Sequence, residues 1–76
     1  MILKYGVRNE KNETVVHIKD NITNVEEIEG SNAPIFHHER GEKPRTYFGN
    51  LKENEHIIFM YLMNDEFKTI KIYKRG

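Results

Sequence analysis

The chain has 76 residues, of which 12 are Lys or Arg and 12 are Asp or Glu, so its formal net charge is zero. This balance excludes a general electrostatic attraction to nucleic acid or to an anionic membrane, and any such binding would have to be local. The absence of cysteine excludes a disulfide framework, a thiolate metal site and a thiol nucleophile.

The length and the first residues set the expected organisation and location. A chain of 76 residues has room for one small core, so we expect a single small domain over residues 1–76. The first residues lack the apolar stretch of a signal peptide, and no apolar segment approaches the roughly 18 residues needed to cross a bilayer. We therefore expect a cytoplasmic protein that makes no contact with membranes.

Alternating apolar and polar residues predict a β-hairpin over the first 19 residues. The first alternating segment ends at Val7, and a second, β-branched segment covers residues 14–19 after the polar residues 9–13. The side chains expected on the core face of this hairpin are Leu3, Tyr5, Val7, Val16 and Ile18.

Residues 20–30 carry a helix-start signal. Thr23 and Glu26 have the spacing of a capping box, and Gly30 can end a helix. Within residues 24–29 only Val25 and Ile28 are apolar, three residues apart. The segment therefore predicts one or two helical turns over residues 24–29, with an irregular loop as the alternative.

A second hairpin is predicted from residues 35–38 and 45–48. Pro34 favours an extended approach to the first of these segments, and the turn-rich residues 40–44 separate the two.

The longest apolar run covers residues 57–63. Its β-branched and aromatic residues favour a strand, although Ile58, Tyr61 and Leu62 would also share one face of a helix. Because the run is apolar at every position, we expect a central strand that the rest of the chain covers on both faces. It is followed by residues 64–66, which turn the chain, and by the alternating residues 67–74, so it predicts a third hairpin.

Three consecutive hairpins predict a mainly β fold, in the range from all-β to α+β. A flat sheet of six strands would leave one face and two edges exposed. We therefore expect a small antiparallel sheet or a half-closed barrel, with at most one short helical turn near residues 24–29.

No residue pattern indicates catalysis. Ser31, the only serine, has no nucleophile-elbow motif around it, and no glycine-rich phosphate loop occurs. The adjacent His37 and His38 would point to opposite faces of a strand, and we interpret these two, His17 and His56 as surface residues. We expect no enzyme activity, no catalytic residues, no metal, no cofactor and no small-molecule substrate.

By elimination, we expect a non-enzymatic interaction protein that binds and modulates a macromolecular partner, most readily a protein. Residues 36–48 mix His, Arg, Tyr and Phe, types that are enriched at interface anchors. The expected partner-binding residues are Phe36, His37, His38, Arg40, Lys43, Arg45, Tyr47 and Phe48. Homodimerisation is a companion expectation, because a small core gains from burying an edge strand.

The alternative is a small-barrel protein that binds nucleic acid on a basic and aromatic sheet face. Bases stack on aromatic rings while cations hold phosphates. The residues expected on that face are Arg45, Tyr47, Lys71, Tyr73 and Arg75.

The high content of Asn, Ile, Lys and Glu suggests an AT-rich genome. A short chain of this kind is typical of bacterial or phage proteins that regulate or inhibit a host factor.

Overall fold

A computed structural model of the chain describes residues 1–30 and 33–73. Its elements are, in chain order, β1 (Ile2–Arg8), β2 (Thr14–Lys19), β3 (Ile22–Glu26), β4 (Ile35–His38), the 3-10 helix η1 (Tyr47–Asn50), β5 (His56–Met63) and β6 (Thr69–Ile72). They form a four-stranded sheet in the order β2-β1-β5-β6 and a two-stranded sheet of β3 and β4. Every pair of neighbouring strands is antiparallel, which confirms the predicted mainly β fold.

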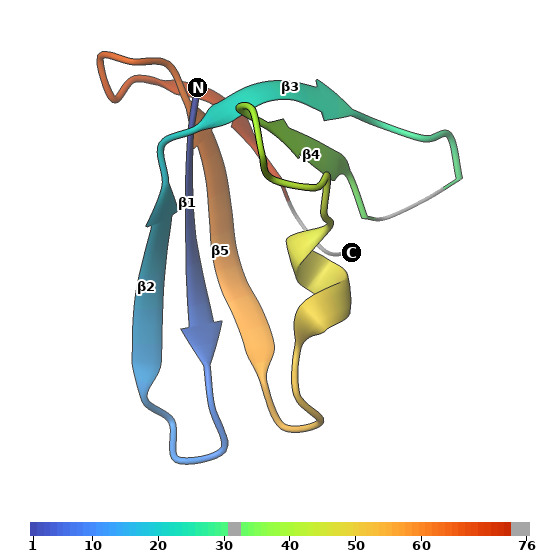
Figure 1. Ribbon diagram of the computed structural model, residues 1–76. Coiled ribbons are helices and arrows are strands. Elements are labelled where there is room, and N and C mark those ends of the chain that lie inside the picture. The colour runs from blue at the N-terminus through green and yellow to red at the C-terminus, as the bar shows by residue number, and fades with distance from the viewer. Residues whose placement is uncertain (31–32, 74–76) are drawn as a thin grey trace.

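The two-stranded sheet lies across one end of the four-stranded sheet, and η1 runs beside β5 (Figure 1). Over the described ranges neither sheet closes into a barrel. No helix in the part of the chain that the structure describes has the length and apolar character needed to span a membrane.

The first hairpin turn is built around Asn9. Its side-chain oxygen accepts hydrogen bonds from the backbone N–H groups of Lys11 and Glu13 at 2.9 and 3.0 Å. Asn12 has φ 62°, in the left-handed region that asparagine tolerates. The turn sets the register of β1 on β2, so that Val7 lies opposite Val15.

The turn between β5 and β6 repeats this design. The side-chain oxygen of Asn64 accepts from the N–H groups of Glu66 and Lys68 at 2.9 and 3.0 Å. The left-handed position is here taken by Phe67, with φ 61°. A large aromatic residue is a poor fit for that conformation, because its Cβ crowds the following carbonyl oxygen.

The predicted helical turn at residues 24–29 is wrong, because β3 extends to Glu26. The two residues of the expected capping box bond across to β4 instead. The Thr23 hydroxyl donates to the His37 carbonyl oxygen at 3.2 Å, and a Glu26 carboxylate oxygen lies 3.3 Å from His37 Nε2. Each side chain therefore supports the pairing of β3 with β4.

The predicted second hairpin forms only in part. Phe36 and Arg45 exchange two backbone hydrogen bonds, of 2.9 and 3.1 Å, in an isolated bridge. The next residues coil into η1, and the strand partner of β4 is β3.

The core lies between the four-stranded sheet, the small sheet and η1. Its buried residues are Leu3, Tyr5, Val7, Ile22, Phe36, Tyr47, Phe48, Met60 and Leu62. The prediction was correct for β1 but wrong for Val16 and Ile18, which are 49% and 57% exposed. They lie opposite Gly6 and Lys4, and directly opposed residues share a face, so they belong to the side of the sheet away from the core.

The apolar run at residues 57–63 is a strand, as predicted, and β5 lies between β1 and β6. The expectation that both of its faces are covered is wrong. Met60 and Leu62 are buried, whereas Phe59 and Tyr61 are only partly buried and Ile58 is 42% exposed.

Candidate functional site

The structure divides the eight predicted partner-binding residues between the interior and the surface. Phe36, His38, Tyr47 and Phe48 are buried. The other four lie at the surface. Arg40 and Lys43 in the turn and Arg45 at the isolated bridge are exposed, and His37 is partly exposed. The aromatic members of the segment therefore serve the core and offer little surface to a partner.

His38 and Tyr47 form a buried polar pair. His38 Nε2 lies 2.6 Å from the Tyr47 hydroxyl oxygen and 3.9 Å from a carboxylate oxygen of Glu42. His38 Nδ1 is buried and has no hydrogen-bond partner among the described residues. Burial raises the pKa of the Tyr47 hydroxyl, the neighbouring Tyr5 adds to the rise, and the Arg45 guanidinium opposes it. Ionisation of the Tyr47 hydroxyl is therefore less favourable in the folded chain than in water.

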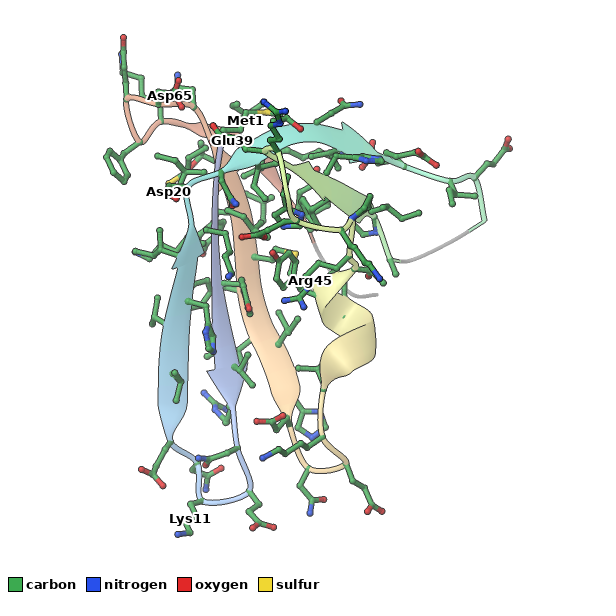
Figure 2. The ribbon with its side chains drawn as sticks, in the orientation of Figure 1. Met1, Lys11, Asp20, Glu39, Arg45 and Asp65 are labelled. Carbon is green, nitrogen blue, oxygen red and sulfur yellow. The ribbon has the colours of Figure 1, made fainter. Side chains whose placement is uncertain are left out.

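A hollow of about 230 Å³ brings Arg45 and Tyr47 together with residues of the first hairpin. The Tyr5 and His17 rings stack at 4.8 Å, and the Arg45 guanidinium carbon lies 5.8 Å from the centre of the Tyr47 ring. Figure 2 shows Arg45 beside η1. The remaining lining residues are Val7, Leu51 and Glu55. This hollow is smaller than an ordinary ligand pocket of roughly 300–1,000 Å³.

The predicted nucleic-acid residues do not form one open face. Tyr47 is buried, and Tyr73 is partly buried with its ring edge-on to Phe36 at 5.6 Å. The Lys71 ammonium group bonds to the Glu27 carboxylate. Arg75 lies outside the described residues.

A different surface stands out, which we call the outer face: the side of the four-stranded sheet that points away from the core. The register places on it two aliphatic side chains of β2, one of β6 and two aromatic rings of β5. Its apolar residues are Val16, Ile18, Phe59, Tyr61 and Ile72. Val16, Ile18 and Ile72 are 49%, 57% and 52% exposed, and no described element covers them.

The two aromatic rings of the outer face are ordered by their neighbours. The Phe59 ring lies over Gly6, whose missing side chain leaves room for it. The Phe59 and Tyr61 rings stack at 5.3 Å with an angle of 17° between their planes. Because Phe59 covers Gly6, apolar surface continues across β1 from Val16 to β5.

A hollow of about 420 Å³ lies along β5 beside the outer face. It is lined by Phe48, Ile57, Ile58, Phe59, Tyr61, Ile72 and Tyr73. The sequence signal that could have indicated this surface is the run at residues 57–63, which is too apolar for a strand with only one covered face.

Comparisons of the chain with models of known protein families, with curated proteins and with solved structures found no match.

Proposed function

We propose that this chain is a non-enzymatic interaction protein that binds and modulates a protein partner through the outer face of its four-stranded sheet. The observation that carries the proposal is the apolar character of that face. An antiparallel sheet that packs on its core with one face ordinarily has polar residues on the other. Here Val16, Ile18 and Ile72 are each about half exposed.

The size of the outer face supports a binding role. Four strands at roughly 4.8 Å spacing and six residues at roughly 3.3 Å each cover about 300 Å² between the outermost strand axes. The largest contiguous apolar patch on a monomer is often a functional site. The hollow along β5 adds a depression in which a side chain of the partner can insert.

The charges of the outer face indicate the chemistry of the partner. Lys4 lies opposite Tyr61, and Arg8 lies opposite His56, so both cations share this face. Within the strands that the structure describes, the register places no carboxylate there. A protein whose apolar contact surface has acidic groups at its rim would complement it.

This role is proposed for the cytoplasm of a bacterium or of an infected host cell. A chain without cysteine needs no oxidising compartment for its fold.

A photo-crosslinking side chain placed on the outer face tests the proposal. We would substitute it for Ile18 and, as a matched control, for Val15, which is 52% exposed on the same strand but on the opposite face. In cells that express the chain, Ile18 should give a discrete adduct with a different protein, and Val15 should not. Equal adducts with a different protein from both positions, or none from either, would overturn the proposal; adducts between two copies of the chain do not count.

The second candidate is a protein that binds single-stranded nucleic acid on the same outer face. Lys4, Arg8 and the two aromatic rings favour it, because cations and aromatic platforms hold phosphates and bases. Stacking of Phe59 on Tyr61 opposes it, since each ring then has one face covered by the other.

Salt dependence separates the two candidates. The test uses a fluorescent single-stranded oligonucleotide. The nucleic-acid candidate is supported if the oligonucleotide binds at low salt, loses affinity steeply as salt rises, and fails to bind the Lys4→Glu variant. Lys52→Glu, a change of an exposed cation in a distant turn, is the control. If the oligonucleotide does not bind at low salt, this second candidate fails.

A further inference from the structure

β2 is an edge strand with an unprotected edge. It pairs with β1 over six residue pairs with no register shift, and among residues 1–30 and 33–73 no second strand pairs with it. Natural edge strands are usually protected by proline, by a bulge or by central charged residues. β2 has no proline, and its one formally charged residue, Lys19, is its last.

The backbone groups that face this edge can be identified. Antiparallel pairs alternate between pairs that exchange two hydrogen bonds and pairs that exchange none. The first turn closes with the Asn9 N–H donating to the Glu13 carbonyl oxygen at 3.0 Å, so this is a bonded pair. Counting along β2, the odd-numbered residues bond to β1. The backbone N–H and C=O groups of the even-numbered residues therefore point outward: Thr14, Val16 and Ile18.

The opposite side of the sheet gives the same alternation. The Tyr73 N–H donates to the Met60 carbonyl oxygen at 2.9 Å, so Met60 directs its backbone groups toward β6. Its neighbours Phe59 and Tyr61 then bond to Gly6 and Lys4 of β1. The even-numbered residues of β1 therefore bond to β5, and the odd-numbered residues of β1 bond to β2.

We propose that β2 pairs antiparallel with β2 of a second copy of this chain, across a two-fold axis that passes between the two Val16 residues. Such an axis is perpendicular to the sheet and requires residues of the same face to lie opposite each other. With Val16 opposite Val16, Thr14 lies opposite Ile18 of the second copy. All three outward-facing residues are then in bonded pairs, and three such pairs give six backbone hydrogen bonds.

Charge complementarity favours a second copy in this register. Glu13 of one copy lies opposite Lys19 of the other, and the symmetry repeats this contact. If the axis moved to Val15, Lys19 would lie opposite Lys11 of the other copy, which is at the tip of the first turn (Figure 2). If it moved to His17, Lys19 would lie opposite the apolar Val15. Both shifted registers also lose one bonded pair.

The resulting dimer has one continuous sheet of eight strands, twice the four of each copy. The two outer faces join, so the apolar surface doubles in extent. Pairing of one edge strand buries less than the roughly 1,000 Å² typical of a stable interface. We therefore expect a dimer that dissociates on dilution. This inference does not depend on the identity of the partner in the proposed function.

Engineered cysteines test the register, because the chain has no other thiol. Val15 lies opposite His17 of the second copy, in a pair that exchanges no hydrogen bonds. The Cα atoms of Val15 and of His17 in the second copy should be about 4.5 Å apart, within the range for a disulfide. Mild oxidation of an equimolar mixture of Val15→Cys and His17→Cys should give a covalent heterodimer, and each variant alone should give no covalent dimer.

Each other result of the oxidation overturns the proposal. A covalent dimer of Val15→Cys alone would place the axis at Val15, and one of His17→Cys alone would place it at His17. Absence of any crosslink at concentrations where sedimentation shows a dimer would move the interface away from β2. A chain that sediments as a monomer at every concentration would exclude the dimer while leaving the outer-face crosslink test unaffected.

A charge exchange supplies a test that leaves the outer face and the core unchanged. Glu13→Lys or Lys19→Glu should each weaken dimerisation by about tenfold, because each converts two attractive pairs into repulsive ones. The double variant that carries both changes should recover the affinity of the original chain. If the double variant is as weak as the single variants, the two side chains do not meet and the register is wrong.

Discussion

The ring of Phe59 occupies the space that a side chain at Gly6 would need. A Cβ built on Gly6 would lie 2.4 Å from Phe59 Cε1 and 2.8 Å from Cζ. The two residues are direct neighbours across β1 and β5. An aromatic ring that covers a cross-strand glycine offsets the poor packing of glycine in a sheet. This contact links the first hairpin to the aromatic pair of the outer face.

We expect Gly6→Ala to lower the free energy of unfolding by about 1 kcal/mol, because Phe59 must leave Gly6 and its stack on Tyr61. In a Phe59→Ala background the same change should raise stability by about 0.5 kcal/mol, since alanine is less flexible than glycine in the unfolded chain. Urea denaturation of the four proteins measures this reversal of sign. An equal effect of Gly6→Ala in both backgrounds would show that the ring yields without cost.

The backbone of Phe67 leads to a second expectation. Its φ of 61° costs a non-glycine residue roughly 1 kcal/mol, and its side chain is 65% exposed and loses little burial when removed. Phe67→Gly should therefore raise the free energy of unfolding by about 1 kcal/mol. Asn12→Gly, at the equivalent position of the other turn, should change it by only a few tenths, because asparagine tolerates this conformation. A loss of stability in Phe67→Gly would reveal a packing role for the ring.

Local patterns in the sequence predicted those parts of the fold that depend on neighbouring residues. The run at residues 57–63 and the alternation at residues 3–7 both indicated the strands that form. The faces of β2 were assigned wrongly because the turn of residues 9–13 sets the register, and a shift of one residue exchanges the two faces.

Long-range contacts account for the other differences. Thr23 and Glu26 have the spacing of a helix cap, yet both interact with His37 on the neighbouring strand. That partner is more than ten residues away in the chain, so no local pattern shows it. The aromatic residues of the predicted site, Phe36 and Tyr47, pack against each other with ring centres 5.7 Å apart. Composition alone does not separate an interface anchor from a core residue of the same type.

Loss of the hydroxyl of Tyr47 should destabilise the fold through His38. Tyr47→Phe removes the 2.6 Å contact to Nε2, and Nδ1 of the same ring already lacks a partner among the described residues. A buried imidazole would then have neither nitrogen hydrogen-bonded, which costs about 1–3 kcal/mol. Tyr61→Phe on the outer face should change stability by no more than about 0.5 kcal/mol. Equal effects of the two changes in urea denaturation would mean that the buried pair contributes no net stability.

Alkaline pH should weaken the fold through Tyr5 and Tyr47. Burial raises the pKa of both hydroxyls above the ordinary value of 10.0. Ionisation is then less favourable in the folded chain than in the unfolded chain. The contribution of these groups to stability is therefore complete below pH 10 and is lost as pH rises through their folded pKa.

The free energy of unfolding should thus decline above pH 10, by up to about 1.4 kcal/mol for each unit by which a folded pKa is raised. Urea denaturation across the alkaline range measures the decline, and ultraviolet absorbance of tyrosinate follows the ionisation directly. Tyr5→Phe and Tyr47→Phe combined should make the decline shallower, because phenylalanine cannot ionise; Tyr73, whose pKa burial also raises, still titrates in this variant. If the double variant loses stability with pH as steeply as the original chain, other groups cause the alkaline unfolding and the two buried hydroxyls do not.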